Sequence, residues 1–200
     1  MSNCSNIEDL VKLKPDYIGF IFYQKSKRYI GEIISNEILS LIPVFIHKVG
    51  VFVDEPFDNL LEKFREYKLD IIQLHGSELP EYCERLKKLD IPIIKVFGID
   101  SEFDFDSLIP YDQFVDYYLF DTVSDLRGGS GLKFDWEKLH YYVGDKPFIL
   151  SGGIHPGDVT DIKCISHKAL YAVDINSGFE LKPGIKDIPK IETFICQLND

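Results

Sequence analysis

The most constraining feature of this sequence is a regular alternation between short apolar runs and amphipathic stretches. The apolar runs are rich in β-branched and aromatic residues, as in strands buried on both faces of a parallel sheet. Seven such runs occur, at residues 17–23, 48–53, 71–74, 93–97, 117–120, 148–151 and 170–175. Their starts lie 22 to 31 residues apart, about the length of one β/α unit. The sequence therefore predicts an α/β fold with right-handed crossovers in a parallel sheet.

The stretches between these runs have helical spacing. The clearest are 57–67, with Leu60, Leu61 and Phe64 on one side, and 79–89, with Leu79, Tyr82, Leu86 and Leu89. Near the N-terminus, Ser5 to Glu8 has the pattern of a capping box, which predicts that the chain opens with a helix. We therefore expect eight helical segments but seven strands. No linker or low-complexity segment interrupts the rhythm, so we expect one domain over residues 1–200.

Both an open doubly wound sheet and a closed barrel fit this alternation. The sequence has no GxGxxG after its first strand and no GxxxxGK[ST], so neither nucleotide-binding signature supports the open sheet. Polar and glycine residues follow most of the predicted strands, at the end where barrel enzymes build their sites. The pattern favours a (β/α)8 TIM barrel from which the first strand is missing.

Composition narrows the functional classes. The formal charge of −11 is spread along the chain, and such a surface repels nucleic acid. The four cysteines form no CxxC pair and no cluster with histidine, which favours reduced thiols over disulfides or a metal site. No apolar run is long enough to span a bilayer, and no signal peptide opens the chain. We expect a cytoplasmic protein that binds neither membrane nor nucleic acid.

Two glycine loops follow the last two predicted strands. The first is Ser151-Gly152-Gly153, and the second runs from Asp174 through Ser177 to Gly178. Glycine lets backbone N–H groups approach an anion closely, and adjacent β/α loops of this kind are the usual phosphate site of a barrel. The alternative interpretation is a pair of tight strand-to-helix turns. Their occurrence on neighbouring strands favours a phosphate site.

Other candidate residues lie at the same predicted edge. Arg28, in KSKRY at 25–29, is suited to a bidentate pair with a carboxylate, or belongs to a solvated basic loop. Asp121 ends a strand, as a catalytic side chain or as a helix cap. Gln73 and His75 lie close by, although a single histidine is more often a structural hydrogen-bonding group. RGGSG at 127–131 suggests a mobile lid or an anion-contacting loop.

Taken together and in order, several segments resemble phosphoribosylanthranilate isomerase. They are GFIFYQKSKRY at 19–29, VGVFVDE at 49–55, IIQLHGSE at 71–78, LFDTVSDLRGGSGLKFDW at 119–136, LSGGIHPGDV at 150–159 and AVDINSGFELKPGIKD at 172–187. The most specific element is KSKRY combined with the DT, GGSG and FDW motifs. The resemblance extends over almost the whole chain.

This resemblance implies an Amadori rearrangement in tryptophan biosynthesis without a metal or organic cofactor. N-(5-phosphoribosyl)anthranilate would open to a Schiff base and lose its C2′ proton. Asp121 would be the general acid that protonates the ribose ring oxygen, and Arg28 would bind the anthranilate carboxylate. The implied ligands of the rest of the substrate are Gln73, His75, Gly129, Gly152, Gly153, Asp174, Ser177 and Gly178.

The general base is missing from this pattern. In the family it is a cysteine at the end of the first strand, in a segment of the form K-[IV]-C-G-[IM], and the pattern places Met1 on the last position of that segment. Cys4 lies past the strand end and lacks the following glycine, so it is a poor substitute. The missing strand and the missing base are one absence.

Three explanations follow for this absence. The sequence begins at an internal methionine, or the chain is a truncated phosphosugar-binding remnant, or another residue removes the proton. We favour the first and regard the third as the weakest. A barrel without its first strand leaves two unpaired strand edges, which predicts poor solubility or dimerisation through that edge. Oligomeric state is otherwise open between monomer and homodimer.

Overall fold

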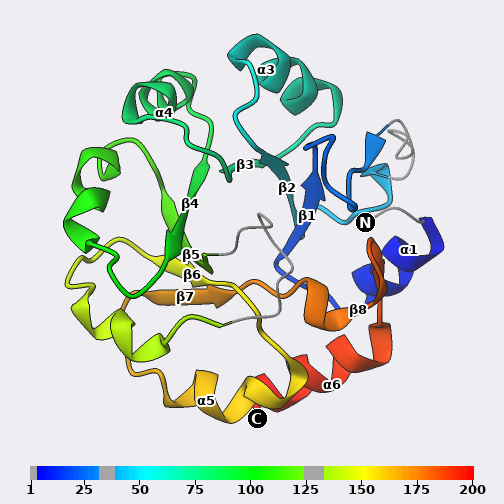
Figure 1. Ribbon diagram of the computed structural model, residues 1–200. Helices are drawn as coiled ribbons and strands as arrows, with labels where there is room; N and C mark the ends of the chain where they lie inside the picture. The colour runs from blue at the N-terminus through cyan, green and yellow to red at the C-terminus, as the bar shows by residue number, and fades with distance from the viewer. Residues whose placement is uncertain (1–3, 32–38, 124–132) are drawn as a thin grey trace.

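The computed structural model describes residues 4–31, 39–123 and 133–200. At its centre is a sheet of seven parallel strands, each beside its sequence neighbour. The strands are β1 (Tyr17–Ile21), β2 (His47–Phe52), β3 (Ile71–Leu74), β4 (Ile93–Ile99), β5 (Tyr117–Thr122), β6 (Phe148–Leu150) and β7 (Leu170–Val173). The sheet curls and the helices lie outside it (Figure 1). A TIM barrel without its first strand is therefore confirmed.

The outer layer contains both α-helices and 3₁₀-helices. The α-helices are α1 (Cys4–Lys12), α3 (Phe57–Glu66), α4 (Pro80–Lys87), α5 (Val159–Cys164) and α6 (Ile188–Asn199). The 3₁₀-helices are η2 (Phe105–Tyr111), η3 (Trp136–Tyr141), η4 (Pro156–Asp158) and η5 (Ser177–Phe179). The crossovers after β4 and β5 thus contain short 3₁₀-helices, and Pro110 lies inside the first of them. Within the described ranges, no helix is long and apolar enough to cross a membrane.

Two local predictions were wrong. The helix α1 already includes Cys4 and Ser5, so Ser5 is not its N-cap; instead Asn6 exchanges hydrogen bonds with the backbone of Lys186. In α4, Pro80 occupies the first helical position, which leaves Leu79 outside the helix and exposed. The buried face of α4 consists of Cys83 and Leu86.

Two apolar cores lie on the two sides of the sheet. The inner core fills the barrel with Val49, Ile71, Ile94, Val96, Leu119 and Ile149. The outer core packs Phe20, Phe52, Phe120 and Phe148 of alternate strand positions against the helices. Strand side chains alternate between faces, so a residue two positions after an inner-core residue on the same strand points into the barrel mouth.

The sheet ends at β1 and β7, and no strand pairing joins these two within the described part of the chain. Gly19 of β1 and Tyr171 of β7 are exposed, whereas all four residues of the central strand β3 are buried. The Tyr17 and Tyr171 hydroxyls lie 2.9 Å apart and link the two edge strands through side chains. The predicted consequence for solubility or dimerisation remains a prediction.

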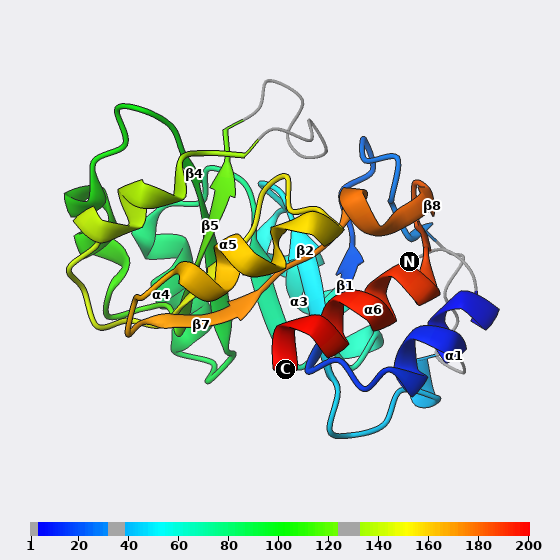
Figure 2. The same ribbon diagram turned by 90° about the horizontal axis from the view of Figure 1, so that it is seen from below.

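A small antiparallel hairpin of β8 (Glu180–Lys182) and β9 (Ile185–Lys186) follows β7 and η5. No sequence pattern predicted this hairpin. Gly184 has a positive φ of 84°, which suits the tight turn between the two strands. Figure 2 shows the hairpin beyond the N-terminal end of α6, on the same side as α1. The hairpin carries two charged residues that become important at the barrel mouth.

Candidate active site

Polar side chains lie at the carboxyl ends of four strands, directly above the inner core. Gln73 follows Ile71 by two positions, Asp121 follows Leu119, and Ser151 follows Ile149. His75 and Asp174 continue the same alternation on β3 and after β7. Residues two apart on a strand share a face, so these side chains point into one mouth. The carboxyl edge of a barrel is where active sites form.

Asp121 is at the centre of this cluster. Its Oδ1 accepts a hydrogen bond of 2.8 Å from the backbone N–H of Thr122, and its Oδ2 lies 3.4 Å from His75 Nε2. His75 Nδ1 is in turn 3.5 Å from Gln73 Nε2. The structure therefore brings together three of the predicted residues. It also shows that His75 contacts a carboxylate and is more than an isolated polar group.

Asp174 has unusual electrostatics. Burial raises the pKa of its carboxyl, and the negative charge of Asp121 raises it further, while Lys186 and the Ser151 hydrogen bond lower it. The Ser151 hydroxyl donates to Asp174 Oδ2 at 3.1 Å. Asp174 thus keeps a proton to higher pH than an ordinary aspartate. An acid needs this property, although the resemblance assigned Asp174 to binding.

The two glycine loops lie against each other and against Asp121. A Cβ on Gly152 would come within 2.4 Å of Thr122 N and 2.7 Å of Asp121 Oδ1. A Cβ on Gly178 would lie 2.4 Å from Ile154 O, in the segment that follows the first loop. Gly152 and Gly153 also have positive φ values of 91° and 62°. Close backbone packing thus requires glycine here, in addition to any role with an anion.

Arg28 already has a bidentate partner within the protein. Its Nε donates to both carboxylate oxygens of Glu180, at 3.1 and 2.9 Å, and Nη2 lies 2.8 Å from Oε2. Burial alone would raise the pKa of Glu180, but the hydrogen bond from Arg28 and the charges of Lys186 and Arg28 lower it overall. Arg28 thus forms a bidentate pair with Glu180, a residue to which no sequence pattern assigned a role, and its binding of a substrate carboxylate remains a prediction.

Lys186 connects this pair to the second glycine loop. Its Nζ donates to Asn176 Oδ1 at 2.7 Å and Asn176 O at 3.2 Å, and lies 3.4 Å from Glu180 Oε1. Burial lowers the pKa of Lys186, opposed by Glu180 and Asp174. We call Arg28, Glu180, Lys186 and Asn176 the Glu180 cluster. It connects the loop that carries Arg28 to the loop that carries Ser177.

The remaining predictions have mixed outcomes. Gly129 and the RGGSG segment lie outside the described residues. Ser177 begins η5, half-buried beside the cluster. All four cysteines lie on helices α1, α4, α5 and α6, so none of them ends a strand of the sheet. Within the described residues, no group of three or more histidine, cysteine or acidic side chains is arranged to bind a metal ion.

A curled parallel sheet with such a polar mouth at its carboxyl edge defines a β/α-barrel enzyme. The family described as N-(5'-phosphoribosyl)anthranilate (PRA) isomerase matches residues 1–197. The chain belongs to this family.

Individual relatives agree with this assignment. An N-(5'-phosphoribosyl)anthranilate isomerase from Parabacteroides distasonis is 43% identical, over 99% of this chain and 90% of the relative. The crystal structure of phosphoribosyl anthranilate isomerase from Thermotoga maritima superposes with a TM-score of 0.87 at 35% identity, over 100% of this chain and 95% of that one. Another solved isomerase, in complex with reduced 1-(o-carboxyphenylamino)-1-deoxyribulose 5-phosphate, has a TM-score of 0.80 at 33% identity, with coverage of 100% and 95%.

Proposed function

We propose that this chain binds N-(5'-phosphoribosyl)anthranilate across its barrel mouth and serves its isomerisation to 1-(2-carboxyphenylamino)-1-deoxyribulose 5-phosphate in tryptophan biosynthesis. One observation carries this proposal: Asp121, His75 and both glycine loops meet at the carboxyl edge of the sheet. The solved relative that holds the reduced product supports a phosphorylated small-molecule ligand.

The phosphate end of the substrate is assigned to the glycine loops. Gly152, Gly153 and Gly178, with Ser177, would offer backbone and hydroxyl donors, and Gly129 would add to them. Asp174 begins the second of these loops and has a raised pKa. A carboxyl that keeps its proton donates a hydrogen bond to a phosphate oxygen without charge repulsion.

The anthranilate end is assigned to Arg28. Glu180 occupies the side of the guanidinium that carries Nε. A guanidinium has five N–H donors, so the Nη1 side can still hold a second carboxylate. Glu180 would then orient Arg28 and fix the direction in which it meets the substrate.

The chemical step is assigned in part. Asp121 would protonate the ribose ring oxygen; the Thr122 N–H orients its Oδ1, and His75 faces its Oδ2. A base must then remove the C2′ proton, and none of the seven described strands ends in a cysteine, because the four cysteines are on helices. The second candidate function is a chain that binds the phosphosugar and turns it over poorly.

One experiment separates the two functions. The purified chain is tested for binding of the reduced product and for turnover, alone and with an added N-terminal segment of the form K-[IV]-C-G-[IM]. We expect binding in both forms, and efficient turnover and rescue of an isomerase-deficient tryptophan auxotroph with the segment. Changing Asp121→Asn in the extended chain should lower turnover about 10²- to 10⁴-fold while binding persists.

The outcomes are distinct. Absence of binding by either form would contradict the proposed function itself. Full turnover by the chain alone would show that a residue other than a strand-end cysteine is the base. Binding without turnover in both forms would support the phosphosugar-binding alternative.

The setting of this activity is also a proposal. We place it in the cytoplasm, in keeping with four free thiols. One solved relative, at 33% identity and a TM-score of 0.79, is described as a monomeric form of a dimeric isomerase from Thermotoga maritima. Either state suits the chain, and the exposed edges of β1 and β7 would favour association between copies.

A further inference from the structure

A buried lysine lies behind the strand that carries His75. Lys95 of β4 pairs in register with Leu74 of β3, and its side chain is 3% exposed. Its neighbours Ile94 and Val96 belong to the inner core, so Lys95 points outward between sheet and helices. A charged group is costly in such a place unless it is paired. The partners of Lys95 therefore show what its charge does.

Lys95 binds the backbone on both sides of His75. Its Nζ donates to Gly76 O at 2.8 Å and to Leu74 O at 3.4 Å. It also forms an ion pair of 3.1 Å with Glu78, whose side chain is 2% exposed. The lysine thus fixes the strand end from which the His75 ring projects into the mouth.

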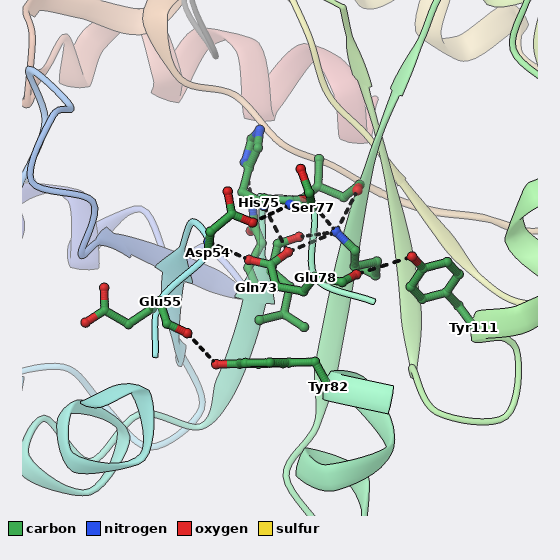
Figure 3. A network of polar contacts seen from close by, with 12 residues as sticks. Asp54, Glu55, Gln73, His75, Ser77, Glu78, Tyr82 and Tyr111 are labelled. Carbon is green, nitrogen blue, oxygen red and sulfur yellow. Dashed lines mark hydrogen bonds and ion pairs between the residues drawn. The ribbon is translucent and has the colours of Figure 1, made fainter. Parts of the chain in front are cut away.

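Glu78 extends this arrangement to the neighbouring loop. Its Oε1 accepts from Asp54 N at 2.9 Å and its Oε2 from Gly76 N at 3.0 Å, while Asp54 Oδ1 accepts from Ser77 N. Figure 3 shows Glu78 between Asp54 and Tyr111, with the His75 ring pointing away from it. We call Lys95, Glu78, Asp54 and Gly76 the Lys95 clamp. It joins the loops that follow β2 and β3 to the middle of β4, behind the site.

We infer that Lys95, paired with Glu78, is a positioning residue that holds His75 against Asp121 and Gln73. The inference rests on the proposed function, since it assigns a role in the same site. Stability alone does not explain this ion pair, because in other proteins well-packed apolar residues often replace a buried ion pair without loss of folding stability. Its specific effect is geometric: the clamp holds four backbone groups of residues 74–77 and so fixes one loop conformation.

The test replaces the whole pair, so that no buried charge is left alone. The double variant Lys95→Met/Glu78→Gln is compared with wild type in binding of the reduced product and in thermal unfolding. We expect cooperative unfolding at a lower Tm, because a glutamine side chain can accept from only one of the two backbone N–H groups that Glu78 serves. We also expect about 10- to 100-fold weaker binding, because the His75 ring is displaced. In a His75→Asn background the same pair replacement should change binding less than about twofold, since coupled residues are not additive.

A matched control uses another lysine–carboxylate ion pair, formed between β2 and the residue that precedes β3. Lys48 and Asp70 form a 3.0 Å ion pair at the opposite end of β2 and β3. The variant Lys48→Met/Asp70→Asn should leave binding within about twofold of wild type in both backgrounds. Equal losses in the two pair variants would mean that any disturbed strand end weakens binding, and would overturn the inference.

A second measurement does not depend on the ligand. The ring C–H resonances of His75 are assigned by NMR through the His75→Asn variant. Replacing the Lys95 pair should shift and broaden them, while those of the other four histidines keep their positions. An unchanged His75 signal in the pair variant would overturn the inference, whether or not the wild type binds the reduced product. Failure of the wild type to bind the reduced product would contradict the proposed function instead.

Discussion

The Lys95 clamp and the Glu180 cluster use similar ion pairs in different surroundings. In the clamp, both side chains are almost fully buried, and the ammonium faces protein acceptors in several directions. In the Glu180 cluster the carboxylate is equally buried, but the Arg28 side chain remains 16% exposed. All partners of the Lys95 ammonium lie within the protein, whereas the Arg28 guanidinium keeps N–H donors on the solvent side. The Lys95 clamp is therefore suited to support the site, and the Glu180 cluster to contact a ligand.

The charge balance of the two groups differs in the same way. Lys95 and Glu78 neutralise each other, while Arg28 and Lys186 share the single carboxylate of Glu180. The Glu180 cluster therefore carries an excess positive charge beside the glycine loops of a chain whose formal charge is −11. A local excess of this kind attracts a small anion that the protein as a whole would repel.

The largest expected effect on stability comes from removing the carboxylate that pairs with buried Lys95. Glu78→Ala should lower the free energy of unfolding by about 3–5 kcal/mol, because Lys95 would stay buried without its counter-charge. Glu180→Ala should cost less, about 1–3 kcal/mol, because Arg28 is partly exposed and Lys186 keeps its hydrogen bond to Asn176. Urea denaturation measures both.

Glu84 supplies the control, since it forms an exposed helical pair with Lys88. Glu84→Ala should change the free energy of unfolding by less than about 0.5 kcal/mol. A loss for Glu180→Ala equal to that for Glu78→Ala would remove the distinction between a buried clamp and a solvent-facing cluster.

A second prediction tests the packing of the glycine loops. Gly178→Ala places a Cβ 2.4 Å from Ile154 O, so the loops must separate, at a cost of about 1–3 kcal/mol in stability. Affinity for the reduced product should fall with it. Gly157→Ala is the matched control, since a Cβ there meets nothing within 4 Å and should leave unfolding and binding nearly unchanged. Equal behaviour of the two variants would show that loop contact does not shape the mouth.

The sequence predicted the sheet well because its signal is local. All seven apolar runs became strands, since continuous β-branched and aromatic residues suit a sheet covered on both faces. The buried face of α4 was mispredicted because Pro80 shifts where the helix begins. The hairpin of β8 and β9 carries no long apolar run, so no periodic signal marked it.

The site was predictable only where residues follow strand ends. Asp121, His75 and Gln73 follow from strand position, whereas the partner of Arg28 lies 152 residues away and leaves no local pattern. Glu180 and Lys186 stood within the FELKPGIKD segment that carried the resemblance, but spacing alone assigned them no role. Lys95 interrupted an apolar run, and this polar residue in a buried strand was the available signal for the clamp.

The smallest expected effect concerns pH and again separates two carboxyls of the mouth. Asp174 has a raised pKa, so its folded form binds more protons, and its ionisation costs stability as pH rises above the ordinary value of 3.8. Asp174→Asn should therefore match wild type in strong acid and become progressively more stable than wild type toward neutral pH.

Glu180 has a lowered pKa, so Glu180→Gln should show the opposite dependence. Its loss of stability should be complete above the ordinary pKa of 4.5 and should shrink as pH falls. Urea denaturation across this pH range measures both differences. Parallel curves for the two variants would mean that the two carboxyls share one electrostatic environment, and that the neutral, phosphate-facing role given to Asp174 is wrong.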